Sequence, residues 1–190
     1  MLLLPGRNSA EKDCAWYIFS PFVCLIMFAM SFLAKAVANE FIELAGGRDL
    51  SPMKLQKLVY FAHGWYLAIT DKALIEENVE AWQFGPVIPE LYQEFKRYGS
   101  GDVSKPSVER GDGSYYIPRI ANLQDDPDAE RAMEVIRSVW DHYGKYSAIK
   151  LSNATHMVGT PWSHCYSPLN LSSAVIPNEE IADYFRCLMP

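Results

Sequence analysis

Apolar residues recur every three or four positions along most of the chain, which is the pattern of amphipathic helices. The clearest case follows Ser51-Pro52, where an N-cap residue precedes the proline typical of a first helical position. The apolar face of this segment consists of Leu55, Leu58, Val59, Ala62, Tyr66 and Ile69. The pattern predicts a central helix about 28 Å long, at 1.5 Å per residue.

Five further helices are predicted from the same periodicity and from residues that start or stop helices. They cover residues 31–45 with Ser31 as N-cap and Gly46-Gly47 as stop, 89–98 closed by Gly99, 127–143 ending near Gly144, 148–157 capped by Ser147, and 178–188 capped by Asn178. The segment around Pro161-Trp162 is predicted as a loop between the last two helices.

Two short segments have the aromatic and β-branched composition of strands. Residues 80–84 end at Gly85-Pro86, and residues 114–117 interrupt a stretch rich in Gly, Pro, Asp and Ser. We predict that these two segments pair. The expected fold class is mainly α with a minor β part: a single helical domain of about six helices with a small two-stranded β element.

Composition supports one globular domain. The 190 residues are 49% hydrophobic and 21% charged, and a chain of this size buries a core without disulfides. The net charge of −6 argues against a surface built to neutralise phosphates, so nucleic-acid binding is not expected. The four cysteines contain no Cys-x-x-Cys pair, which favours a reducing, cytoplasmic setting.

The first thirty residues differ from the rest. Residues 14–34 carry no charged side chain, a length that could cross a bilayer. Three interpretations stay open: an upstream extension of the reading frame with the true start at Met30, an ordered extension, and a membrane anchor. We therefore treat residues 1–29 as an apolar N-terminal extension and residues 30–190 as the domain.

Two segments carry a family resemblance. They are Lys54-Leu-Gln-Lys-Leu-Val-Tyr-Phe-Ala-His-Gly-Trp-Tyr-Leu-Ala68 and Ala81-Trp-Gln-Phe-Gly-Pro-Val-Ile-Pro-Glu-Leu-Tyr92. Both resemble the Panacea family of SocA-like and phage-associated GepA-like proteins. Two later pieces follow in family order, Val139-Trp-Asp-His-Tyr-Gly144 and Pro161-Trp162. The resemblance implies an antitoxin that neutralises a cognate toxin by direct binding. It also implies an alternative, a proteolytic adaptor that delivers the toxin to an ATP-dependent protease.

The chain lacks the usual sequence signals of an enzyme. Phosphate-binding glycine loops and the serine-hydrolase motif are absent from the sequence, and we expect no cofactor. His142, His156, His164 and Cys165 lack the short paired spacings of a metal site, so no metal is expected. Cys165 beside His164 is not read as a nucleophile with its base, because catalysis requires a spatial arrangement that sequence neighbours seldom adopt.

Five residues are predicted to bind the partner: Lys54, Lys57, Tyr60, His63 and Trp82. The first four lie on the central helix and would form a polar and aromatic strip there; the alternative is that the lysines are solvated and His63 is a hydrogen-bonded helix residue. A DNA-binding autoregulator, with Lys54 and Lys57 on phosphate, and a homo-oligomer also stay open. Gly64, Gly85, Pro86 and Trp162 are predicted to be structural, with the Trp82 segment packing closely on Gly64. Trp82, Phe84, Gly85 and Pro86 could alternatively form the rim of a pocket.

Overall fold

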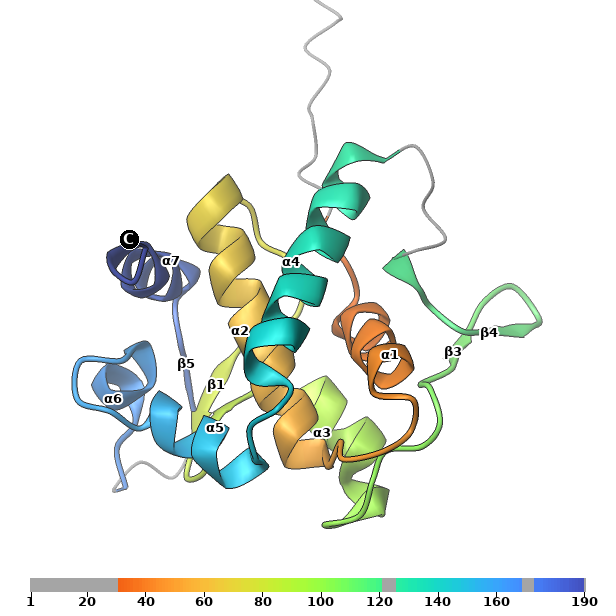
Figure 1. Cartoon of the computed structure of the whole chain (residues 1–190), viewed down its shortest axis with the longest axis horizontal. Helices are drawn as coiled ribbons and strands as arrows, with labels where there is room; N and C mark the ends of the chain where they lie inside the picture. The colour runs from red at the N-terminus through yellow and green to blue at the C-terminus, as the bar shows by residue number, and fades with distance from the viewer. Residues whose placement is uncertain (1–30, 121–125, 169–172, 190) are drawn as a thin grey trace, which may run out of the picture.

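A computed structural model describes residues 31–120, 126–168 and 173–189. The helices gather around one central helix, α2 (Pro52–Thr70) (Figure 1). The others are α1 (Ala34–Ala45), α3 (Pro89–Phe95), a 3-10 turn (Lys96–Tyr98), α4 (Pro127–Tyr143), α5 (Ala148–Thr155), α6 (Pro161–Cys165) and α7 (Asn178–Cys187). The predicted class, mainly α with a minor β part, is confirmed. The short helix α6 lies where a loop was predicted.

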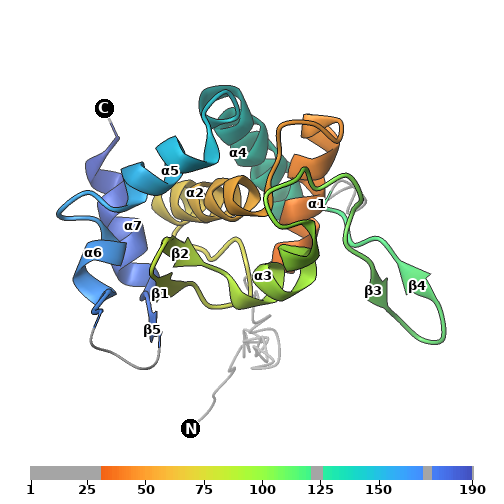
Figure 2. The ribbon, with the colours of Figure 1, turned by 90° about the horizontal axis from the view of Figure 1, so that it is seen from below.

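The strands form two small antiparallel sheets. In the larger sheet, β1 (Glu80–Trp82) lies between β2 (Gly85–Val87) and β5 (Ala174–Val175). In the smaller one, β3 (Glu109–Arg110) pairs with β4 (Tyr115–Tyr116) as a hairpin that projects from the helices (Figure 2).

The predicted pairing of residues 114–117 with the Trp82 strand is therefore wrong. The turn between β3 and β4 is closed locally: the Gly111 N–H donates to the Ser114 carbonyl at 2.9 Å, and Gly113 has a φ of 85°. A hairpin of so few residues requires little loop-closure entropy, whereas pairing with a distant strand requires more.

The predicted start of the central helix agrees with the structure. The Ser51 side chain accepts from the Lys54 N–H, and Pro52 is the first helical residue. The helix ends at Thr70, and its C-cap residue Asp71 has the left-handed conformation, with a φ of 57°. An αL residue at this point lets the chain turn away while its N–H still bonds the last turn.

Helix α1 begins three residues later than predicted. Ser31 is not its N-cap; instead, both carboxylate oxygens of Glu77 accept from the Ala34 N–H, at 3.0 and 2.8 Å. Phe32 pairs with Ile75 as an isolated parallel bridge, which keeps the preceding residues extended. The predicted stop at Gly46 is confirmed, with a φ of 58°.

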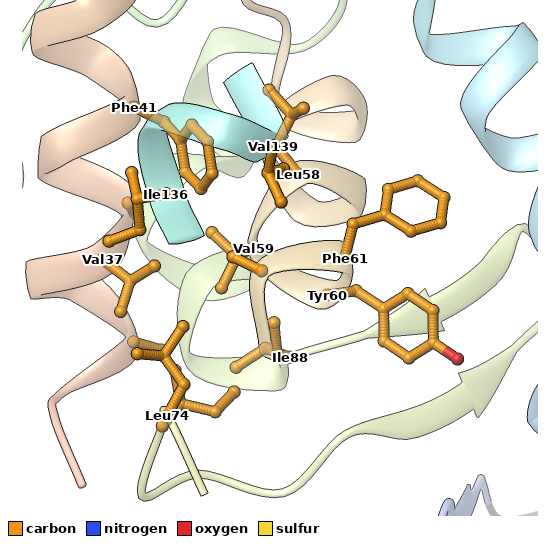
Figure 3. Close-up of a cluster of buried hydrophobic side chains, with 14 of the residues drawn as sticks. Val37, Phe41, Leu58, Val59, Tyr60, Phe61, Leu74, Ile88, Ile136 and Val139 are labelled. Carbon is orange, nitrogen blue, oxygen red and sulfur yellow. The ribbon is translucent and has the colours of Figure 1, made fainter. Parts of the chain in front are cut away.

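The core lies on every side of α2. Val59 points toward Val37 on α1, and Leu58 lies beside Val139 of α4, whereas Tyr60 and Phe61 point away from α1 (Figure 3). Helices α1, α3, α4, α5 and α7 and strand β2 all contact α2. A helix surrounded in this way must bury polar positions along with apolar ones.

Among the described helices, none combines the length and apolar character needed to cross a membrane. Residues 14–30 of the uncharged stretch lie outside the described residues, so the three interpretations of that stretch stay predictions.

Candidate functional site

Four of the five predicted partner-binding side chains lie inside the protein. Lys54 is 2% exposed, Lys57 1%, Tyr60 2% and His63 0%. They do not form an exposed strip, and the alternative that the lysines are solvated is equally wrong. The reason is that α2 has neighbours on all sides, so its polar residues face other elements of the chain. Their part in partner binding stays a prediction.

Two of these residues fasten neighbouring segments to α2. Lys54 donates to Asp49 at 2.8 Å, which holds the loop before the helix. His63 lies between the Asn178 side chain, 3.0 Å from Nε2, and the Ile75 N–H, 3.5 Å from Nδ1. Because Nδ1 accepts, Nε2 is the atom that donates to Asn178. Burial lowers the pKa of His63 to about 4, with the bond to Asn178 opposing the shift. His63 is thus a hydrogen-bonded helix residue.

The two family segments contact each other through Gln56 and Lys57. The Gln56 side chain makes two 3.0 Å hydrogen bonds with the backbone of Ile88, one as donor and one as acceptor. The Lys57 amine donates to the Pro86 carbonyl at 2.9 Å, and burial lowers its pKa to about 7. These bonds satisfy backbone groups at the edge of β2, which is otherwise open to strand addition.

Gly85 allows this close approach. Its φ is 100°, and a Cβ there would be 2.7 Å from the Thr155 hydroxyl and 2.9 Å from Lys57 Cε. Both the backbone conformation and the available space therefore require glycine.

Gly64 has a different neighbour from the one predicted. A Cβ at this position would meet the ring of Phe185 on α7, so the expectation that the Trp82 segment packs there is wrong. Tyr60 packs edge-on against the same ring, with 5.9 Å between centroids, and burial raises the pKa of its hydroxyl.

Trp162 joins α6 to the end of β1. Its indole N–H donates to the Trp82 carbonyl at 2.7 Å, and its ring stacks on Tyr166 with 4.6 Å between centroids. Thr160 caps α6 and Pro161 is its first residue. The Thr-Pro pair is the signal that could have distinguished this short helix from a loop.

A groove of about 470 Å³ opens where the two family segments meet, and we call it the β1–β2 groove. Its lining includes Met53, Lys57, Trp82, Phe84, Tyr92 and Lys96. Phe84 is 61% and Tyr92 41% exposed, whereas Lys57 is 1% exposed; the lysine therefore lies at the inner end and the aromatic rings at the rim. Trp82 and Tyr92 are in contact, with 5.0 Å between ring centroids.

The groove brings together two of the predicted partner-binding residues, Lys57 and Trp82. Lys54, Tyr60 and His63 are not part of its lining. Tyr92, in the predicted helix of residues 89–98, has its ring at the rim of the groove. Of the four residues offered as a possible pocket rim, Trp82 and Phe84 line the groove, whereas Gly85 and Pro86 are buried and do not.

The expectation that Cys165 and His164 are not a nucleophile and its base stays a prediction. Burial and then Glu180 raise the pKa of the Cys165 thiol, which opposes the thiolate that a nucleophile needs. His164 Nδ1 lies 3.7 Å from the Glu180 carboxylate. Within the described ranges, no group of three or more His, Cys, Asp or Glu side chains is placed to hold a metal ion.

Comparison with known proteins identifies the family. Residues 55–163 match the model of the family described as antitoxin SocA-like, Panacea domain. This chain belongs to that family. The sequence is also similar to antitoxin SocA of Caulobacter vibrioides (strain NA1000 / CB15N), with 32% identity over 131 residues, 68% of each protein. The predicted family is thus confirmed, and it is a family of antitoxins. No solved structure matches the chain.

Proposed function

We propose that this protein neutralises a toxin by binding it directly, and that the toxin binds at the β1–β2 groove. The observation that carries the proposal is the pair of exposed rings, Phe84 and Tyr92, on a groove built from both family segments. Aromatic side chains at a partly open groove concentrate binding energy when a partner covers them. A partner segment placed there would cover Trp82 as well.

A second hollow is less suited to this role. It has a volume of about 460 Å³ and lies between α2 and α4, with Trp65, Ile69 and Val139 in its lining. Its charged residues Arg131 and Glu134 have opposite signs and pair with each other at 3.4 Å. Because these two charges already pair with each other, they contribute little to the binding of a charged partner.

The alternative of a DNA-binding autoregulator loses its proposed contacts. Lys54 and Lys57 would have to reach phosphate groups, yet both are buried and both donate to acceptors within the chain. A non-enzymatic role is part of the proposal, and the raised pKa of Cys165 disfavours that thiol as a nucleophile.

The test is co-expression with the product of the gene adjacent to this one, under an inducible promoter. We expect the wild-type protein to restore growth and to co-purify with that product. Phe84→Ser should weaken the complex by roughly 30-fold, the loss expected for an interface hot spot. Ile149→Ser is the matched control, because Ile149 is 69% exposed on α5, away from the groove lining.

Equal growth and equal affinity of the Phe84 and Ile149 variants would contradict the groove as the binding surface. The absence of both rescue and complex formation with wild-type protein would contradict the antitoxin proposal itself. The half-life of the toxin distinguishes the proteolytic adaptor, which requires that the toxin persists longer in cells that lack this protein.

A further inference from the structure

The charge of the β1–β2 groove differs in sign from that of the whole protein. The chain has 23 acidic and 17 basic residues, yet the residues that line the groove include Lys57 and Lys96 and neither Asp nor Glu. Among the residues that the structure describes, Glu80 is a carboxylate bonded to a lining side chain, and it accepts from the Trp82 indole N–H at 2.7 Å. A lining of one charge sign in an acidic protein favours a partner group of opposite charge.

Lys57 is the more informative of the two lysines. Its ammonium form has three N–H donors, and in the described part of the chain the Pro86 carbonyl is its one hydrogen-bond acceptor. The side chain is 1% exposed, so an acceptor reaches the remaining donors only when the side chain or the groove wall moves. An anionic oxygen that entered the groove would offer an acceptor and would favour the charged form of the amine.

The start of α2 adds to this preference. Pro52 and Met53 line the groove and are the first two residues of a 19-residue helix. The amino-terminal end of a helix carries partial positive charge, which favours an anion nearby. Lys57 and the helix end therefore act in the same direction.

Most of the remaining lining is aromatic or aliphatic, and its polar side chains are two neutral amides, Gln56 and Gln83. Trp82, Phe84, Tyr92 and Met53 surround the opening, and Met53, at 38% exposure, has the flexible side chain that adapts to irregular partners. The volume of about 470 Å³ lies within the range of pockets that hold one small ligand. It fits one or two side chains of a partner and not the whole face of a helix.

We propose that the β1–β2 groove binds a toxin segment in which an aromatic or long aliphatic side chain lies next to a carboxylate. The apolar side chain occupies the space between Trp82, Phe84 and Tyr92, and the carboxylate pairs with Lys57. Lys96, at the outer edge, attracts the segment by its charge. This inference rests on the proposed function, because it assigns the chemistry of the toxin surface that the antitoxin recognises.

Residues 14–30 of this chain are an alternative occupant with different chemistry. They are apolar, but they contain no Asp or Glu that could supply the carboxylate. A second copy of the chain is another alternative. The experiments below distinguish both from a toxin segment.

The first experiment tests the chemistry of the groove without any toxin. The full chain is titrated with 3-phenylpropionate and, separately, with its neutral analogue 3-phenylpropionamide, while 1H–15N NMR spectra report the signals of Trp82, Phe84 and Lys96. We expect both compounds to shift these signals and the acid to bind roughly tenfold more tightly, the factor for one charge-assisted hydrogen bond. Lys57→Met should abolish that preference. Lys96→Glu should reduce it, whereas Lys150→Glu on α5 should leave it unchanged.

Equal binding of acid and amide, a preference that survives Lys57→Met, or no shift of the groove signals would each overturn the inference. Because this experiment contains no toxin, its result stands whatever the growth assay shows. A failure of the growth assay alone would therefore contradict the proposed function, and a failure here would contradict the groove chemistry.

The second experiment identifies the occupant in the complex. A photo-crosslinking p-benzoylphenylalanine replaces Phe84, or Ile149 as control, in cells that co-express the toxin, and mass spectrometry locates the crosslinked residues. We expect position 84, and not position 149, to crosslink to a toxin segment that contains an apolar residue beside Asp, Glu or a chain terminus. Crosslinks to residues 1–30, to a second copy, or to a basic toxin segment would overturn the proposal.

Discussion

The ring of Phe185 fills the space that a side chain at Gly64 would occupy. A Cβ built on Gly64 would lie 2.2 Å from Cε2 and 2.6 Å from Cζ of that ring. Phe185 is fully buried, and the rings of Tyr60, Phe61 and Trp65 all contact it. The aromatic neighbours leave the ring little room to move, so the contact between α2 and α7 depends on this glycine.

Gly64→Ala should therefore destabilise the protein, although alanine is the better helix former. We expect the free energy of unfolding to fall by about 1–3 kcal/mol, since overpacking outweighs a propensity gain of roughly 1 kcal/mol. Urea denaturation measures the change. In the double variant with Phe185→Leu, the loss should be smaller than the sum of the two single losses. Additive losses would show that the ring and the glycine are not in conflict.

Lys57 should make stability depend on pH above neutrality. Burial lowers its folded-state pKa to about 7 from 10.5, so between these values the unfolded chain holds more protons than the folded one. The contribution of Lys57 to the free energy of unfolding therefore rises with pH across that window. This contribution is complete above pH 10.5 and is lost as the pH falls through 7. Lys57→Met has no amine to titrate, so it lacks this dependence of stability on pH.

We expect Lys57→Met to be more stable than the wild type at pH 6, and the gap in the free energy of unfolding to shrink by roughly 3 kcal/mol by pH 9.5. Urea denaturation of both proteins at several pH values between 6 and 9.5 measures the gap. Lys150→Met is the control, because Lys150 lies on the surface, and its gap should stay constant. A constant gap for Lys57→Met as well would mean that the amine stays charged in the folded protein.

His63 should act in the acidic range. Its folded-state pKa of about 4 lies below the ordinary 6.5, so the unfolded chain binds the extra proton as pH falls between these values. The contribution of the neutral His63 ring to the free energy of unfolding is complete above pH 6.5. It is lost as the pH falls toward 4, by roughly 3 kcal/mol in total. His63→Gln should remove this part of the acid sensitivity, as measured by thermal or urea unfolding. The exposed His142, replaced in the same way, should not.

Local signals in the sequence predicted the helices well where the cap lies next to the helix. Ser51-Pro52 and Gly46 are such cases, because each makes its bond within one turn. The start of α1 could not be found in this way. Its cap is the carboxylate of Glu77, 43 residues away, and only the folded chain brings the two together.

The candidate site was predicted only in part, because its contacts also join residues that are far apart in the sequence. A periodic pattern assigns polar residues of a helix to the surface, and this failed for Lys54, Lys57 and His63 because α2 is surrounded and each side chain finds a distant partner. Gln56 was missed, although its two bonds to Ile88 align the family segments. Nothing in a single sequence shows which polar residue of a buried helix faces which backbone group.

Trp162→Phe should destabilise the contact between α6 and the end of β1. The change removes the indole N–H that donates to the Trp82 carbonyl at 2.7 Å but keeps a ring to stack on Tyr166. We expect a loss of about 1–2 kcal/mol in the free energy of unfolding, because the carbonyl at the end of β1 loses its donor. Trp140→Phe is the control, since Trp140 is also half-buried and packs on the core. Equal losses for the two variants would show that the hydrogen bond adds nothing beyond the volume of the ring.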